Sequence, residues 1–184
     1  MDNTVTSPRT WKNKGKEANV YLTYLIEHYD RLPSIIAFIH SHQFAWHTDA
    51  SGYDNARSLR SLRPDFVRES GYVNLRCQHS PGCPQEVQPF RKNKDKATEV
   101  VFADAWQSIF NVTDIPRIVA APCCAQFAVS REQVLKRTRD EYIWYHHWLM
   151  NTTLEDDVSG RIFEYLWYVS SMSSPIDEPW RSMS

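Results

Sequence analysis

Glycine is scarce in this chain, which has five glycines among 184 residues. Phosphate-binding loops and dinucleotide-binding turns depend on glycine, because only glycine lets the backbone approach a phosphate closely. The sequence contains no G-x-G-x-x-G turn, no phosphate-binding loop, no G-x-S-x-G elbow and no H-E-x-x-H helix. It therefore argues against a dinucleotide or nucleoside-triphosphate site and implies no cofactor with a familiar fingerprint.

An excess of one charge and long apolar runs are also missing. With 21 basic and 22 acidic residues the net charge is −1, and no basic stripe suggests a nucleic-acid partner. No stretch approaches the roughly 20 apolar residues of a membrane span. The first four residues lack the charged and apolar parts of a signal peptide. We therefore expect a cytoplasmic protein without a membrane span.

Cysteine is sparse, and its four positions leave three interpretations open. Cys77 and Cys83 flank a Pro-Gly turn that could close a disulfide, whereas Cys123 and Cys124 are adjacent. Zinc ligation by all four, with His79, is a second interpretation, although the spacing departs from the usual knuckles. Reduced structural thiols are the third, because disulfides are rare in the cytosol. The sequence does not decide their oxidation state.

Aromatic side chains, in contrast, are abundant: seven Trp, nine Tyr and eight Phe make up 13% of the residues. Such rings build a core and can line an apolar small-molecule pocket. A chain of this length with 42% apolar residues is most simply one domain. We expect a flexible N-terminal segment at 1–12, one domain at 13–172 and a C-terminal tail at 173–184.

Apolar patterning predicts helices that alternate with short strands. The predicted helices are residues 17–29, 54–62, 96–110, 131–150 and 159–170, and the predicted strands are 34–39, 72–75, 117–120 and 126–129. We expect the helix at 54–62 to end before Pro64, and a capping box at Ser130-x-x-Gln133 to open the longest helix. This alternation predicts an α/β fold, with a short, mostly parallel central sheet flanked by helices.

Three histidines follow the predicted strand at 34–39. His40, His42 and His47 lie within eight positions, together with Trp46. Ligands bind beyond the carboxyl ends of strands in open α/β sheets, and imidazole suits both proton transfer and metal ligation near neutral pH. We therefore predict that His40 and His42 are catalytic acid–base or hydrogen-bonding groups. The alternative is that these histidines form hydrogen bonds within the loop.

The same histidines could hold a divalent metal. His40 and His42 are two residues apart, so on an extended segment they point to the same side and can chelate one ion. His47 would be the third ligand, and an open position would remain for substrate, as in catalytic metal sites. A metal-free pocket is the competing prediction, with one imidazole acting as general acid or base. No cofactor is firmly implied.

Glu164 is the other candidate catalytic residue. It lies in an aromatic helix, where a desolvated carboxylate would suit acid–base work. The alternative is a helix-surface residue that points away from the core. Residues expected to contact the substrate are Tyr21, Phe44, Trp46, Gln126 and Tyr165.

Several separated motifs together resemble one family. They are N-K-G-K-E-A at 13–18, F-I-H-S-H at 38–42, P-G-C-P at 81–84, C-C-A-Q-F-A-V-S-R at 123–131 and F-E-Y-L-W at 163–167. This pattern resembles the largely fungal domain of unknown function 3431 family, over about residues 13–170. The family's opening is similar to that of nucleotide-sugar glycosyltransferases. In that analogy His40-Ser41-His42 falls near the place of their acidic metal motif.

The chain departs from that pattern in two ways, and the departures shape the expected function. It begins almost at Asn13, without the preceding nucleotide-binding strand, which argues against a sugar-nucleotide substrate, and it has Tyr168 where the family favours His. The resemblance implies a small soluble enzyme of fungal secondary metabolism. We expect it to act on a hydrophobic small molecule by non-redox cyclisation, isomerisation or elimination. The alternatives are a metal-dependent glycosyltransferase-like enzyme and a non-catalytic small-molecule-binding or interaction protein. The oligomeric state is open.

Overall fold

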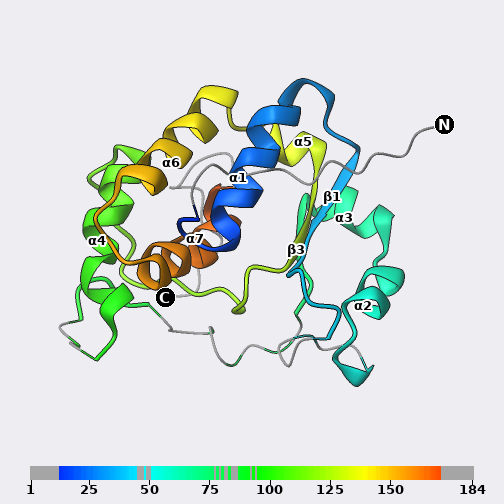
Figure 1. The fold of residues 1–184 in the computed structure, drawn as a ribbon, viewed down its shortest axis with the longest axis horizontal. Coiled ribbons are helices and arrows are strands. Elements are labelled where there is room, and N and C mark those ends of the chain that lie inside the picture. The colour runs from blue at the N-terminus through cyan, green and yellow to red at the C-terminus, as the bar shows by residue number, and fades with distance from the viewer. Residues whose placement is uncertain are drawn as a thin grey trace.

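The computed structural model describes residues 13–170, except 45–47, 49–50, 77, 79, 81–82, 84–86, 92 and 94. The predicted N-terminal segment 1–12 and tail 173–184 lie outside the described residues. The elements, shown in Figure 1, are α1 (Glu17–His28), η1 (Tyr29–Arg31), β1 (Ile35–Phe38), η2 (Ser51–Tyr53), α2 (Asn55–Ser61), α3 (Pro64–Ser70), β2 (Tyr72–Asn74), α4 (Ala97–Phe110), β3 (Phe127–Ser130), α5 (Arg131–Val134), α6 (Arg139–Asn151) and α7 (Asp156–Ser170).

The sheet has three strands in the order β1-β3-β2, and β3 is antiparallel to both neighbours. The predicted α/β class is confirmed, but the prediction of a mostly parallel sheet is wrong. The error has a physical cause. All four residues of β3 are buried, and an apolar run without polar alternation is typical of parallel strands because helices cover both of their faces. Here helices cover both faces of an antiparallel sheet, so the same pattern arises.

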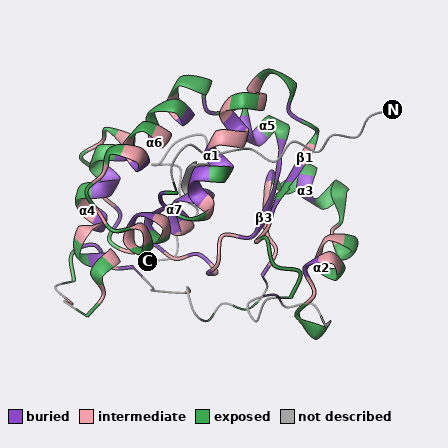
Figure 2. Cartoon of the chain, in the orientation of Figure 1, coloured by how far each residue is buried: buried purple, intermediate pink, exposed green. Residues whose placement is uncertain are grey.

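The longer helices α1, α4, α6 and α7 gather on one side of the sheet, and α3 packs against the strands from the other side (Figure 1). Phe127 and Val129 of β3 join the main core together with Tyr21 and Trp167 from the long helices. Ala128 alternates to the opposite face and is fully buried. Figure 2 shows buried residues between the long helices and along β3. Among the described residues, no helix is long and apolar enough to cross a bilayer.

The predicted helix at 131–150 is interrupted. Ser130 caps α5 as predicted, with its hydroxyl oxygen accepting a hydrogen bond from the Gln133 N–H, but α5 ends at Val134. A second capping box, formed by Thr138 and Glu141, starts α6. Two tyrosine hydroxyls bind carbonyl oxygens at the break: Tyr142 donates to Val134 at 3.0 Å, and Tyr29 donates to Arg137 at 2.6 Å. Tertiary hydrogen bonds therefore replace the helical ones there.

Two other local predictions differ from the structure. Pro64 starts α3 rather than only stopping the helix before it, because proline fits the first turn, where its missing N–H is not needed. The predicted strand at 117–120 is reduced to an isolated bridge between Val119 and Val87. Prolines at 116 and 122 flank this segment and leave little room for a longer ladder.

Candidate functional site

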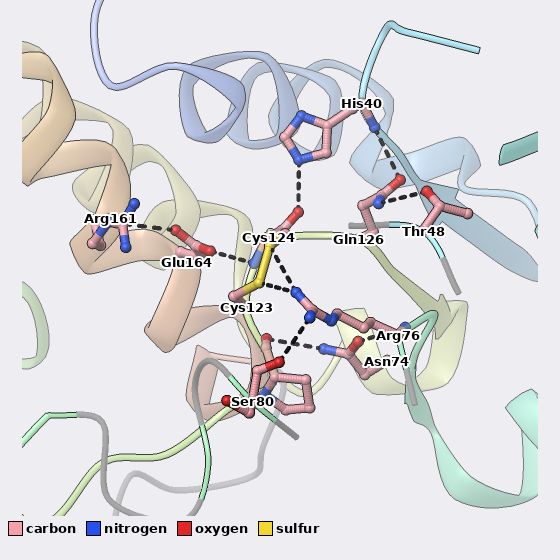
Figure 3. Close-up of a disulfide and its surroundings, with 11 residues drawn as sticks. His40, Thr48, Asn74, Arg76, Ser80, Cys123, Cys124, Gln126, Arg161 and Glu164 are labelled. Atoms are coloured by element: carbon pink, nitrogen blue, oxygen red, sulfur yellow. Dashed lines mark hydrogen bonds and ion pairs between the residues drawn. A yellow bond between two sulfur atoms is a disulfide. The ribbon is translucent and has the colours of Figure 1, made fainter. Parts of the chain in front are cut away.

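The antiparallel sheet brings three chain segments to one edge. Since β1 and β2 both run opposite to β3, the residues that follow β1 and β2 lie beside the residues that precede β3. His40 follows β1, Arg76 follows β2, and Cys123 and Cys124 precede β3. Figure 3 shows His40 and Arg76 converging on Cys123 and Cys124, with Glu164 of α7 facing the pair from the helix layer. The site therefore lies where the sheet edge meets α7.

A cavity of about 310 Å³ adjoins this point. Its size lies at the lower end of the range for small-molecule sites, roughly 300–1,000 Å³. One face of α7 forms a wall, because the spacing of its lining residues repeats with the helical turn. The cavity is lined by Lys16, Glu17, Ala18, His40, Cys124, Ala125, Asp157, Gly160, Arg161, Glu164 and Trp167. The lining is therefore mostly charged, with an apolar wall at Trp167 and two alanines.

Glu17 and His40 form a paired acid and base at the cavity wall. The Nδ1 atom of His40 lies 2.8 Å from Oε1 of Glu17, and Nε2 lies 2.7 Å from the carbonyl oxygen of Cys124. A carbonyl oxygen only accepts, so Nε2 carries a proton, and the ionised pair places the second proton on Nδ1. Both ring nitrogens of His40 are then donors, and its imidazolium is held between two oxygen atoms.

The electrostatics agree with this protonation state. Burial lowers the pKa of His40, but the hydrogen bond and the charge of Glu17 outweigh it and, with the Cys124 carbonyl, hold the pKa above 6.5. In turn, the hydrogen bond from His40 is the main cause that holds the pKa of Glu17 below 4.5, although burial opposes it. The pair therefore favours the imidazolium form of His40 and the carboxylate form of Glu17.

The backbone of Cys124 is held at both of its polar atoms. Its carbonyl oxygen accepts from His40, and its N–H donates to Oε1 of Glu164. Oε2 of Glu164 lies 4.0 Å from Nε of Arg161, at the edge of ion-pair distance. Cys123 and Cys124 are joined by a disulfide. For these two residues the structure departs from the reduced thiols that a cytosolic location implies, whereas Cys77 lies outside the described residues.

Backbone strain gathers at this cavity. Among the described residues other than glycine, five have positive φ, and three of these line it: Lys16 at 53°, Cys124 at 87° and Ala125 at 47°. A side chain in this region costs on the order of 1–3 kcal/mol, and such residues concentrate at functional sites. The strain is thus an independent indication that this cavity is used.

The other predicted site residues are dispersed. His42 and Phe44 are exposed and do not line the cavity. Gln126 is buried behind His40, whose backbone N–H lies 3.5 Å from its Oε1, and its amide nitrogen lies 3.4 Å from the Thr48 hydroxyl. Of the predicted site residues, His40 and Glu164 meet at the cavity.

Both predicted tyrosines are core residues. Tyr21 packs against Phe38, Phe127 and Trp167 and does not line the cavity. Burial raises its pKa far above 10, so its hydroxyl stays neutral. Tyr165 lies on another face of α7 and lines a separate cavity of about 300 Å³. Trp46 and His47 lie outside the described residues.

The described residues do not assemble the predicted three-histidine metal site. Both ring nitrogens of His40 have partners, His42 faces solvent and His47 lies outside the described part of the chain. Within the described ranges, one group offers three ligand atoms within 4.8 Å of one another, namely Cys123, Cys124 and Glu164. The sulfur atoms of that group are bonded to each other, and the Arg76 guanidinium beside them opposes a second cation.

Sequence reasoning missed Glu17, Arg76 and the positions of Lys16 and Arg161. A usable signal existed for Arg76, because it follows the predicted strand at 72–75 as closely as His40 follows the one at 34–39. Glu17 stands in the N-K-G-K-E-A motif at 13–18, but that motif assigns it no role, and locally it is the first residue of an amphipathic helix. Its role depends on where α1 meets the sheet edge, which is a tertiary property.

The comparisons with known proteins give one match. The model of a family described as "Protein of unknown function (DUF3431)" matches residues 1–181. No curated protein and no solved structure matches the chain. The match confirms the family that the sequence motifs suggested.

Proposed function

Because the chain belongs to the DUF3431 family, whose description carries no activity, we propose from the cavity's geometry that this protein is an enzyme acting on a small molecule by non-redox proton-transfer chemistry. The reaction is a cyclisation, isomerisation or elimination. The observation that carries the proposal is the pair of groups that bind the backbone of Cys124: an anchored carboxylate, Glu164, on its N–H and a fixed imidazolium, His40, on its carbonyl oxygen.

Glu164 is assigned as the proton-transferring residue. Its side chain is 14% exposed, and Oε1 is fixed by the backbone N–H of Cys124. Such an anchor removes rotational freedom, so Oε2 can face one position of a bound substrate. Its weak contact with Arg161, at 4.0 Å, leaves Oε2 accessible for accepting and returning a proton.

His40 is assigned a different role from the mobile base predicted from sequence. Its two N–H groups are already used by Glu17 and Cys124, so the ring does not accept a proton from substrate. Its positive charge at the cavity wall is fixed before substrate binds. A preorganised cation stabilises negative charge that develops on a substrate oxygen as Glu164 removes a proton.

The lining also constrains the substrate. Trp167 and the alanines offer an apolar surface, while Lys16 and Arg161 add cationic groups at the rim. Lys16 is paired with Asp157 at 2.7 Å, so it closes one side of the cavity between α1 and α7. We assign a substrate that combines an apolar body with an oxygen-bearing polar group. A place in fungal secondary metabolism, suggested by the family resemblance, is part of the proposal.

The test uses solvent deuterium. Purified protein is incubated in D₂O with a panel of small carbonyl-bearing and prenylated compounds, and products are analysed by mass spectrometry for deuterium at carbon. We expect Glu164→Gln to lower kcat by about 10²–10⁴-fold, because general acid–base catalysis contributes that much. Glu155→Gln, an exposed carboxylate outside the cavity, is the matched control. Turnover by Glu164→Gln at the rate of the unaltered protein would remove Glu164 from the mechanism.

A further inference from the structure

The Cys123–Cys124 disulfide lies against the cavity but has no part in the chemistry proposed above. We propose that this pair is a second reactive centre, a dithiol–disulfide couple that exchanges with small-molecule thiols entering through the cavity. Cys124 lines the cavity and is partly exposed, whereas Cys123 is 4% exposed. The two sulfur atoms therefore differ in access, which decides which of them a thiol can attack.

The surroundings of the pair favour the thiolate form that exchange requires. Arg76 is 5% exposed; its NH1 contacts the sulfur of Cys123 and lies 3.4 Å from the sulfur of Cys124. A hydrogen bond of 2.8 Å from NH2 to the Ser80 carbonyl holds the guanidinium in place (Figure 3). Arginine keeps its charge at every relevant pH, and a neighbouring cation lowers the pKa of a thiol.

The exchange balances as two successive substitutions at sulfur. A thiolate from the small molecule attacks Sγ of Cys124, the disulfide breaks, and Cys123 leaves as a thiolate beside Arg76. The mixed disulfide joins Cys124 to the first small molecule. A second small-molecule thiolate then attacks the small-molecule sulfur of this mixed disulfide and releases the Cys124 thiolate. Two small thiols are oxidised to one disulfide, and the protein disulfide gains two electrons. Their protons go to the protein thiols or to solvent.

Three charged groups face the pair: Arg76 after β2, Glu164 on α7 and His40 after β1. Glu164 binds the N–H of the Cys123–Cys124 peptide inside the disulfide ring, and His40 binds the carbonyl of the next peptide, Cys124–Ala125. Opening the ring frees the backbone of Cys124, so the redox state of the pair and the acid–base groups are linked. This coupling rests on the proposed function, whereas the exchange itself does not.

The exchange is tested by mapping cysteines after native reduction. Trypsin releases residues 118–131 as one peptide, which contains Cys123 and Cys124 and no other cysteine. In protein purified without thiols, we expect the mass of this peptide to be lower than that of its dithiol form by two hydrogen atoms. After native incubation with dithiothreitol and removal of the reductant, iodoacetamide added under denaturing conditions should alkylate both cysteines, and native incubation with oxidised glutathione should restore the disulfide. A pair that opens only after denaturation, or never forms the disulfide, overturns the proposal.

The role of Arg76 is tested on the reduced protein. We expect Arg76→Met to slow alkylation of the 118–131 peptide at pH 7 by about tenfold, since one pKa unit changes the thiolate fraction by that factor. Arg76→Lys keeps a cation and is the control, with a loss of less than about threefold. Circular dichroism checks that both variants fold. Equal alkylation rates in Arg76→Met and the unaltered protein would overturn the assignment of Arg76.

The coupling has a separate readout. The ring protons of His40, assigned by comparison with His40→Gln, are titrated by NMR in the oxidised and the reduced protein. We expect the pKa of His40 to fall on reduction, because the Cys124 carbonyl that helps to raise it moves. An unchanged titration overturns the coupling, while the alkylation result still decides the exchange. The deuterium experiment with Glu164→Gln, in contrast, tests the proposed function alone and does not bear on the thiol–disulfide exchange.

Discussion

A single residue, His40, illustrates how the role that the structure suggests for a predicted site residue can differ from the role predicted from sequence. The sequence indicates an imidazole beyond a strand, which predicts a proton carrier. In the structure its two nitrogens donate to a carboxylate and to a carbonyl, so the ring acts as a fixed cation. Its charge depends on Glu17 across the α1–β1 junction. The chemistry of a histidine is set by its two partners, and neither partner can be read from the neighbouring sequence.

The ion pair of His40 and Glu17 predicts a specific pH dependence of stability. His40 has a raised pKa, so its contribution is fully present below 6.5 and is lost as the pH rises through the raised value. Glu17 has a lowered pKa, so its contribution is present above 4.5 and is lost as the pH falls through the lowered value. The two contributions coincide between pH 4.5 and 6.5, where the pair is fully charged.

We expect His40→Gln to lower the free energy of unfolding most in that window. The loss should be about 1 kcal/mol, below the roughly 1.5–3 kcal/mol of charge-assisted hydrogen bonds, because Glu17 is 34% exposed and water screens the pair. Urea denaturation at half-unit steps from pH 3.5 to 9 measures the difference between the two proteins. His42→Gln is the control, since that ring is exposed. A difference that stays constant across this range would contradict the ionised pair.

At the scale of elements, the sequence predicts most of the helices and all three strands of the sheet. Amphipathic spacing defines α1 and α4 nearly to the residue, because each buries one face and ends at a local signal. The break between α5 and α6 was not predicted, although Thr138-x-x-Glu141 is a capping-box signature in the sequence, and hydrogen bonds from Tyr29 and Tyr142 stabilise it. The direction of the strands was predicted wrongly, because a strand that is buried on both faces has the same apolar pattern whether it is parallel or antiparallel.

The start of α1 depends on one glycine. Gly15 has φ of 67°, and a Cβ there would lie 2.4 Å from the Leu149 side chain of α6. We expect Gly15→Ala to cost about 2–4 kcal/mol, the sum of backbone strain and overpacking, measured by urea denaturation. Gly52→Ala is the matched control, because Gly52 has φ of 73° but no atom within 4 Å of an added Cβ. Equal losses in both variants would show that strain alone, without the contact to α6, sets the cost.

At the scale of the whole molecule, the cavity is assembled from segments that lie far apart in the sequence. The start of α1, the residue after β1, the turn before β3 and one face of α7 each supply part of its lining. No local motif holds these parts together, so the cavity exists only in the folded chain. Its integrity depends on contacts that pack α4 and α6 against α1 and α7, some of them remote from the cavity.

One contact outside the lining of the cavity is the ion pair of the buried Glu99 with the partly exposed Arg91, which ties the connection after β2 to the start of α4. Glu99 is 1% exposed, and its oxygens accept from Arg91 at 2.8 and 2.6 Å and from the Gln88 N–H at 2.9 Å. Burial raises the pKa of Glu99, but these hydrogen bonds outweigh it and hold the pKa below 4.5. The contribution of the pair is therefore present above pH 4.5 and is lost as the pH falls through the lowered value.

We expect Arg91→Met to lower the free energy of unfolding at pH 7 by about 3 kcal/mol, because it leaves a buried carboxylate without its cation. The double variant Arg91→Met/Glu99→Gln should recover part of that loss, since it also removes the buried charge. Arg68→Met breaks an exposed pair with Asp65 and should show no measurable loss. Urea denaturation compares the four proteins. A double variant less stable than Arg91→Met would show that Glu99 stabilises the fold through Gln88 rather than through its charge pair with Arg91.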